Sequence, residues 1–220
     1  MTQDVLIPKM KRLDRSQRRI KIPMLNFVIV VFGTILITAA SFIDLNIKHF
    51  ILPISIFAIK NPTLDDFVFG FHLIPQIPVV LFVCSVLGRK MALTSVILYI
   101  LAGLFFIPVF GLGGGIKYIF EYGFGYILAY IPAVIIAGLL LKKYTFSRML
   151  GAAFAGVLTI HIIGILYMII LALLKHAGAD FIGGWIAAQS GLKIIYDIIA
   201  SFLLILISKY IHSGLEFILK

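Results

Sequence analysis

Residues 149–174 read MLGAAFAGVLTIHIIGILYMIILALL, a run of 26 residues without lysine, arginine, aspartate or glutamate. A helix that rises ~1.5 Å per residue needs about 20 apolar residues to cross a hydrocarbon core ~30 Å thick. Five more segments are comparably apolar: about 24–43, 68–88, 91–110, 124–141 and 186–208. The chain is 62% hydrophobic and 13% charged, against roughly 45–50% apolar in soluble domains. We therefore predict an all-α integral membrane protein, a bundle of six transmembrane helices in the cell membrane.

Basic residues alternate between the ends of these segments. If the N-terminus is cytoplasmic, fourteen of the nineteen basic residues fall on the inner side, as the positive-inside rule requires. Both termini are then cytoplasmic, and contact with anionic lipid accounts for the net charge of +10 without nucleic acid. The inner residues are Lys9, Lys11, Arg12, Arg15, Arg18, Arg19, Lys21, Arg89, Lys90, Lys142, Lys143, Arg148, Lys209 and Lys220.

The domain organisation follows from this topology. Residues 1–22 form a basic cytoplasmic arm, 23–211 a membrane domain and 212–220 a cytoplasmic tail. The first apolar run is too long for the core of a typical signal peptide, so we interpret it as a retained helix. The outer connection 44–67 contains a short apolar piece, 50–59, that cannot span the bilayer, and we predict an interfacial or re-entrant lid there.

Glycine and aromatic residues are concentrated in the connection 108–126, PVFGLGGGIKYIFEYGFGY. Glycines allow positive φ and close backbone approach, and aromatic rings offer flat apolar faces to a ligand. The stretch is therefore either a ligand-binding loop or a tight turn between two helices. The topology places it on the outer side, together with the lid.

Charged residues inside the last apolar segment are the other unusual feature. Gln189, Lys193 and Asp197 are spaced i, i+4, i+8 and share one face of a predicted helix. Buried charges cost ~2.5–3.5 kcal/mol each on insertion scales, so they are expected to be paired or to hold a ligand. Either Lys193 and Asp197 neutralise each other, or they face a polar pocket that Trp185 caps. His161 is either a hydrogen-bonded core histidine or part of a proton relay.

Enzyme motifs are missing from the sequence. There is no H-E-x-x-H, no G-x-S-x-G and no histidine cluster. The run Gly111–Lys117 resembles a phosphate loop but has Ile116 where glycine is required. The single Cys84 excludes disulfides within the chain and thiolate metal sites. We therefore expect no enzyme, no metal and no cofactor, and any ATP hydrolysis must come from another subunit.

Several motifs together resemble the BioY family, the biotin-binding S components of energy-coupling factor (ECF) transporters. They occur in the family's order over about residues 68–210. They are Pro75-Gln-Ile-Pro-Val-Val-Leu, Val86-Leu-Gly-Arg-Lys, Leu98-Tyr-Ile-Leu-Ala-Gly-Leu-Phe-Phe-Ile-Pro-Val-Phe110, Gly113-Gly-Gly and Gly123-Phe-Gly-Tyr-Ile-Leu-Ala-Tyr-Ile-Pro-Ala.

The resemblance implies capture of biotin at the outer face, with partners that are a transmembrane coupling subunit and a pair of ATP-binding cassette ATPases. The family's last helix begins Pro-Gly-Asp-x-x-Lys. Lys193 matches this lysine, Ser190 stands at the aspartate position, and Asp197 is the candidate replacement one turn deeper. The predicted ligand-binding residues are Phe110, Gly113, Gly114, Tyr122, Gly125, Tyr126, Gln189, Lys193 and Asp197.

Two alternatives remain open at this point. One keeps the architecture but changes the ligand to another vitamin, such as riboflavin or thiamin. The other is a small membrane protein without a transport role.

Overall fold

A computed structural model describes residues 22–50 and 67–218. The predicted basic arm before Ile22 and nearly all of the predicted apolar lid piece, 50–59, lie outside these residues. The described elements are α1 (Ile22–Ser41), β1 (Leu45–Phe50), β2 (Val68–Leu73), α2 (Gln76–Phe105), the 3₁₀ helix η3 (Ile116–Phe120), α3 (Phe124–Leu140), α4 (Phe146–Leu174), α5 (Ala179–Gln189) and α6 (Lys193–Ile218).

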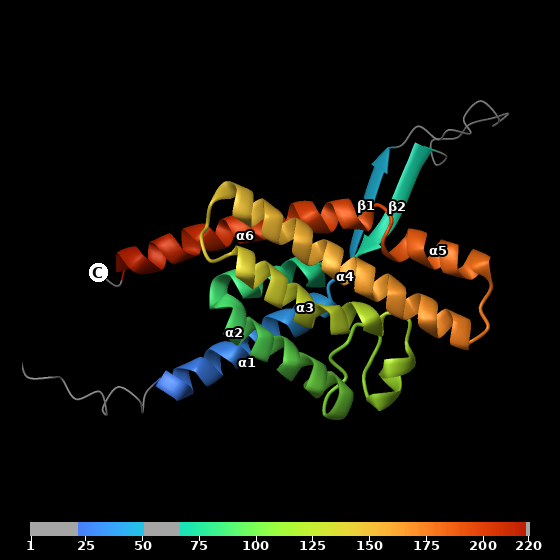
Figure 1. Ribbon diagram of the computed structural model, residues 1–220, viewed down its shortest axis with the longest axis horizontal. Coiled ribbons are helices and arrows are strands. Elements are labelled where there is room, and N and C mark those ends of the chain that lie inside the picture. The colour runs from blue at the N-terminus through green and yellow to red at the C-terminus, as the bar shows by residue number, and fades with distance from the viewer. Residues whose placement is uncertain (1–21, 51–66, 219–220) are drawn as a thin grey trace, which may run out of the picture.

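Helices dominate the fold (Figure 1). In the described part of the chain, four helical stretches are long and apolar enough to cross a membrane, namely Met24–Ser41, Gln76–Phe105, Phe146–Leu174 and Ala179–Ile211, and Phe124–Leu140 is a shorter apolar helix. Helices α1, α3 and α4 agree closely with the predicted segments 24–43, 124–141 and 149–174. The fold class is thus helical and membrane-spanning, as expected.

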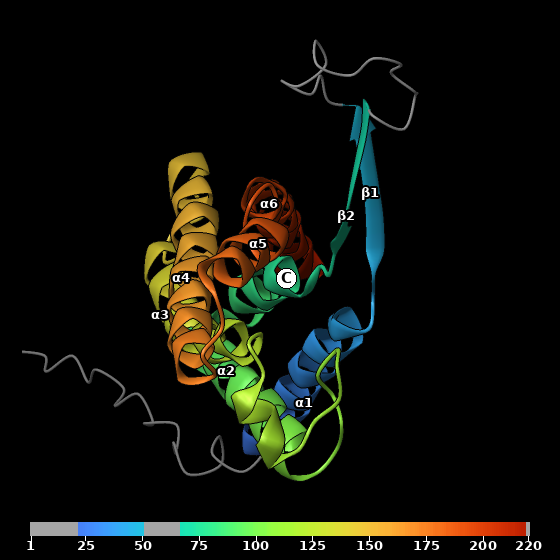
Figure 2. The ribbon, with the colours of Figure 1, turned by 90° about the vertical axis from the view of Figure 1, so that its right-hand side faces the viewer.

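The prediction of a helix over 68–88 is wrong at its start. Residues 68–73 form β2, which pairs antiparallel with β1 in a register that sets Leu45 opposite Leu73. The two strands extend away from the helices (Figures 1 and 2). At the base of this hairpin, Asp44 Oδ2 lies 2.8 Å from His72 Nδ1. The described start of the predicted interfacial or re-entrant lid, Leu45–Phe50, is therefore a strand, and it pairs with the segment that was predicted to begin a membrane helix.

Helix α2 consists of two arms joined at Gly88, whose φ of 77° and ψ of 162° are not helical. The Gln76 amide donates to the Tyr99 hydroxyl across 2.7 Å. A straight helix would hold residues 23 positions apart at roughly 35 Å, at ~1.5 Å per residue. The arms therefore fold back on each other, and they correspond to the predicted segments 68–88 and 91–110.

The end of α3 lies beside this turn in α2. A Cβ added at Gly138 would lie 2.7 Å from the Arg89 side chain, and the Tyr144 hydroxyl donates to the Ser85 carbonyl. The turn at Gly88 and the α3–α4 connection are therefore on the same end of the bundle.

The last predicted segment, 186–208, is broken in the structure. Helix α5 ends at Gln189 and α6 begins at Lys193, so Gln189, Lys193 and Asp197 do not share one continuous helix. Helix α5 runs back beside the end of α4 and leads into α6 (Figures 1 and 2). The described residues of α5 include no buried side chain.

The packing between α3 and α4 is reciprocal. A Cβ at Gly125 would meet the Tyr167 side chain at 2.3 Å, and a Cβ at Gly164 would meet the Tyr126 ring at 2.5 Å. Each helix therefore receives an aromatic residue of the other over a glycine. Tyr126 and Tyr167 are partly buried and pack against the main core, most of whose buried residues come from α2, α3 and α4, with Ile37 of α1 and Ile205 of α6.

Candidate functional site

A cavity of about 350 Å³ opens between η3, α3, α4, the α5–α6 turn and the first turn of α2. One side is aromatic and the other is polar, a combination typical of small-molecule sites. Its lining residues are Ser41, Leu73, Ile74, Gln76, Ile77, Gly111, Leu112, Tyr118, Glu121, Tyr122, Gly123, Tyr126, Ile127, Tyr130, His161, Trp185, Gln189, Lys193 and Asp197.

The aromatic side is formed by rings from α3 and its N-terminal approach and from α5. The Trp185 ring lies 5.7 Å from the Tyr126 ring and 6.3 Å from the Tyr122 ring, measured between centroids. Phe181 lies 5.1 Å from Tyr122. These tilted and edge-on arrangements are favourable between aromatic rings. They are the contacts through which α5 closes one side of the cavity.

Tyr122 is also held from outside the cavity. Lys175, at the C-terminal end of α4, places its ammonium 4.4 Å from the centre of the Tyr122 ring. The same ammonium donates a 2.7 Å hydrogen bond to the Phe120 carbonyl. Lys175 therefore fixes the chain on both sides of Glu121 by a cation–π contact and a backbone hydrogen bond.

Five of the predicted ligand-binding residues line the cavity: Tyr122, Tyr126, Gln189, Lys193 and Asp197. The other four, Phe110, Gly113, Gly114 and Gly125, are not among its lining residues and remain predictions as ligand contacts.

Phe110 is fully buried in the core. Its ring packs over Gly103, where a Cβ would come within 2.2 Å of it, and it contacts the Tyr99 and Tyr118 rings. Phe110 and Gly113 exchange two backbone hydrogen bonds, of 3.0 and 2.9 Å, and Gly113 has a φ of 124°. The first part of the connection 108–126 is thus a tight turn, and its second part lines the cavity.

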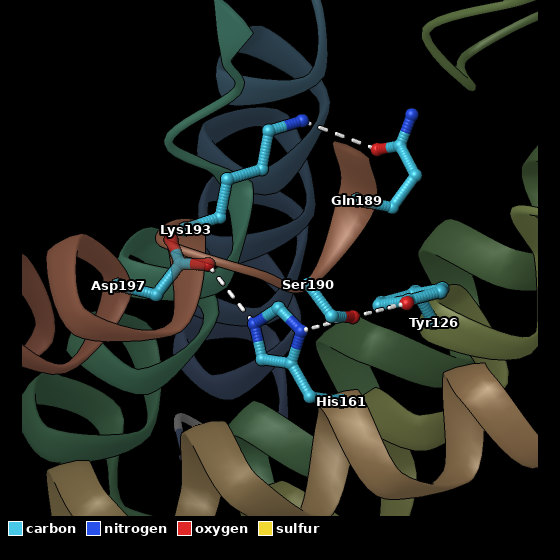
Figure 3. Close-up of polar contacts among 6 residues, drawn as sticks. All are labelled: Tyr126, His161, Gln189, Ser190, Lys193 and Asp197. Carbon is cyan, nitrogen blue, oxygen red and sulfur yellow. Dashed lines mark hydrogen bonds and ion pairs between the residues drawn. The ribbon is translucent and has the colours of Figure 1, made fainter. Parts of the chain in front are cut away.

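The polar side carries its charge at two levels. Nearer the hairpin, the Lys193 ammonium donates to the Gln189 side-chain oxygen across 3.2 Å (Figure 3). Both residues also line a neighbouring cavity of about 310 Å³ between β2 and the α5–α6 turn. Lys193 and Gln189 therefore lie on the boundary between the two spaces.

Asp197 lies deeper and is only 2% exposed. Its Oδ2 is 3.1 Å from Nε2 of His161, which is equally buried. Because a carboxylate oxygen only accepts, Nε2 carries the hydrogen of this bond. Asp197 therefore pairs with His161 of α4. The predicted option in which Lys193 and Asp197 neutralise each other is not the arrangement found.

His161 continues this contact to the other side of the site (Figure 3). Its Nδ1 lies 2.9 Å from the Ser190 hydroxyl oxygen, which is 2.5 Å from the Tyr126 hydroxyl oxygen. The resulting chain of contacts, Tyr126–Ser190–His161–Asp197, connects α3, the α5–α6 turn, α4 and α6. We call it the polar relay.

A second polar group lies at the start of α2. The Tyr130 hydroxyl donates to the Gln76 side-chain oxygen across 3.0 Å, and the Gln76 amide donates to Tyr99. Gln76 and Tyr130 line the cavity and were not predicted. Both residues are surrounded by apolar neighbours in the sequence. The position of Gln76 between Pro75 and Pro78 is the one sequence signal that could have indicated a binding role.

The connection before α3 contributes Tyr118, which lies on η3. Burial raises the pKa of the Tyr118 hydroxyl above its usual value, so this group stays neutral and can hydrogen-bond as an alcohol. Within residues 22–50 and 67–218, no three His, Cys, Asp or Glu side chains are placed to hold a metal ion. With aromatic rings on one side and polar groups on the other, the cavity is suited to an organic ligand with an apolar body and polar ends.

Comparisons with known proteins agree with the resemblance noted in the sequence. The model of the BioY family matches residues 65–217. The crystal structure at 2.1 Å of the S-component for biotin from an ECF-type ABC transporter has a similar fold, with a TM-score of 0.62 and 17% identity. The match covers 91% of this chain and 95% of that one. A comparison with curated proteins gave no match.

Proposed function

This chain belongs to the BioY family, and on that premise we propose that it is the biotin-binding S component of an ECF transporter. The observation that carries the proposal is a cavity of about 350 Å³ with aromatic rings on one side and Lys193, Gln189 and Asp197 on the other. Biotin has an apolar bicyclic body and valeryl chain, with a ureido group at one end and a carboxylate at the other. Its chemistry matches this distribution of groups.

Biotin is neutral at its ureido end and negatively charged at its carboxylate end. The polar side of the cavity likewise has two different levels, with the Lys193 ammonium nearer the hairpin and the Asp197 carboxylate deeper. The Lys193 ammonium lies on the boundary with the second cavity. We propose that it binds the carboxylate of biotin by a charge-assisted hydrogen bond. Tyr122, Tyr126 and Trp185 then contact the apolar body, and Gln189, whose side-chain oxygen already accepts from Lys193, keeps the ammonium in place.

The transport context is also part of the proposal. Two arms of α2, together with α1, α3, α4 and α6, give six crossings with both termini cytoplasmic. The common end of the Gly88 turn and the α3–α4 connection supports this arrangement, because Arg89, Lys90, Lys142, Lys143 and Arg148 all lie near that end. A coupling subunit and two ATPases supply the energy for import, because the sequence contains no ATP-hydrolysing motif of its own. The cytoplasmic segments 1–22 and 212–220 then flank a single membrane domain.

A titration of the purified protein tests the ligand. Isothermal titration calorimetry in detergent micelles is expected to show binding of biotin in preference to riboflavin and thiamin. Tight binding of another vitamin, with no heat from biotin, would replace biotin as the ligand. Co-purification of an ATP-binding subunit with a tagged chain tests the transport role, and its absence from the native membrane would favour a non-transport protein.

The Lys193→Ala substitution tests the site. Loss of a hydrogen bond between charged groups costs about 1.5–3 kcal/mol, so we expect biotin affinity to fall roughly 10- to 100-fold. Lys143→Ala removes the same charge from the exposed α3–α4 connection and is expected to leave affinity unchanged. Equal affinities of the two variants would remove Lys193 from the binding site.

A further inference from the structure

One carboxylate oxygen in the cavity wall is buried without a partner. Asp197 Oδ2 accepts from His161, but Oδ1 has no hydrogen-bond partner among the described residues. Figure 3 shows Oδ1 turned away from His161, on the side of Lys193. A buried polar atom without a partner is costly and calls for an explanation. Because Asp197 lines the cavity, a donor on a bound ligand would satisfy it.

The polar relay determines which way its hydrogens point. His161 Nε2 donates to Asp197, so in the neutral ring Nδ1 accepts from the Ser190 hydroxyl. The Ser190 oxygen then accepts from the Tyr126 hydroxyl. Every donor of the relay is used within it, and none is left for Asp197 Oδ1. His161 thus holds the carboxylate by one oxygen and leaves the other as a fixed acceptor.

We propose that Asp197 Oδ1 accepts a hydrogen bond from a ureido N–H of the bound ligand, and that His161 is the positioning residue that holds this carboxylate in place. This inference rests on the proposed function, in which Lys193 binds the carboxylate of biotin, and it assigns the ureido group at the opposite end of the ligand to Asp197. An acidic acceptor at this depth selects a ligand with N–H donors and disfavours one with an acceptor there.

Asp197→Asn gives a direct test because it changes polarity with little change in size. The asparagine oxygen accepts from His161, and its amide then points an N–H toward the ligand's N–H. We expect biotin affinity to fall roughly 10- to 100-fold, the range for a hydrogen bond to a charged group.

Ligand analogues make the test specific for this end of the molecule. Biotin methylated on the ureido nitrogens lacks the N–H donors, whereas biotin methyl ester lacks the carboxylate. The wild-type protein is expected to bind the N-methylated analogue roughly 10- to 100-fold more weakly than biotin, and Asp197→Asn to discriminate less than about 3-fold. The methyl ester is the control, because its loss of affinity should be the same in wild type and Asp197→Asn.

His161 is tested by two substitutions of different chemistry. His161→Leu removes the donor to Asp197, and His161→Gln keeps an N–H on a side chain of similar reach. We expect the leucine variant to lose discrimination against the N-methylated analogue and the glutamine variant to recover most of it. A purely structural role for His161 would instead weaken all three ligands equally in both variants.

The outcomes separate the two proposals. A wild-type protein that binds no biotin overturns both of them. If the wild-type protein binds biotin, but wild type and Asp197→Asn discriminate equally well against the N-methylated analogue, only the assignment of Asp197 is overturned. If His161→Leu does not fold, the glutamine variant and the wild-type to Asp197→Asn pair still decide the question.

Discussion

Two walls of the cavity carry aromatic residues, but they are built in different ways. In the wall formed by α3 and α4, Tyr126 lies over Gly164 and Tyr167 lies over Gly125. Each aromatic side chain is so close to its glycine that a Cβ would not fit between them. The wall formed by α5 contributes Trp185, and Phe181 of the same helix packs on Tyr122 without lining the cavity. No residue of α5 is buried in its described length. One wall belongs to the core, and the other rests on it.

This difference indicates how the two walls respond to a ligand. The Tyr126 ring packs on α4 over Gly164, so we expect its position to change little when the cavity is filled. Helix α5 is held in large part by ring contacts at the cavity itself, between Trp185, Phe181, Tyr122 and Tyr126. Elements with few buried contacts open at low free-energy cost. A ligand that fills the cavity should therefore stabilise α5 far more than it stabilises α3.

The largest effect is expected from Gly164→Ala, which breaks the fixed wall. The new methyl group would lie 2.5 Å from the Tyr126 ring, and overpacking of this kind costs about 1–3 kcal/mol. The displaced ring would carry Ser190 and the polar relay with it. We expect a lower melting temperature and a fall in biotin affinity of roughly tenfold or more, measured by thermal unfolding and calorimetry.

Gly151→Ala is the matched control for this change. Gly151 lies on the same helix, and a Cβ there meets nothing within 4 Å. The variant should keep wild-type affinity and melting temperature, or gain slightly from the better helix propensity of alanine. If both variants behave alike, the reciprocal packing of α3 and α4 does not position Tyr126.

A smaller and different effect is expected from Trp185→Ala on the α5 wall. The substitution removes ring contacts worth about 0.5–1.5 kcal/mol each and opens the cavity. We expect biotin affinity to fall several-fold to roughly tenfold, with little change in the melting temperature of the ligand-free protein. Ile182→Ala, which shortens another half-buried side chain of α5, is the control and should leave affinity unchanged. A lower melting temperature without ligand for Trp185→Ala would show that α5 is part of the core.

The sequence predicts the helices well because charge-free length is a strong physical signal in a membrane protein. The error at residues 68–73 arises because that segment joins an apolar helix without a charged residue between them, and length alone cannot separate a strand from a helix. Its pattern VFGFHL does contain a signal, since Phe69, Phe71 and Leu73 alternate with Val68, Gly70 and His72. Alternation with period two indicates a strand.

The site was only partly predictable. A membrane helix that retains Lys193 and Asp197 points to a polar cavity on energetic grounds alone, and both residues line one. Their partners could not be predicted, because His161 is 36 positions from Asp197 on another helix and its facing direction depends on how α4 packs. The role of Phe110 in the core follows from a turn geometry that glycine content allows but does not specify.

The smallest effect is expected from Lys175→Ala, because Lys175 is exposed and acts on the cavity only through Tyr122. Its cation–π contact and its hydrogen bond to the Phe120 carbonyl are each worth about 0.5–1 kcal/mol at an exposed site. We expect biotin affinity to fall about 2- to 5-fold in calorimetry. Lys117→Ala removes an equal charge from the exposed face of η3 and is the control for general electrostatic attraction of an anionic ligand. If the two variants lose affinity equally, Lys175 attracts the ligand by its charge and does not position Tyr122. If only Lys175→Ala loses affinity, Lys175 at the end of α4 positions Tyr122, and through Tyr122 it also helps to hold Trp185 of α5.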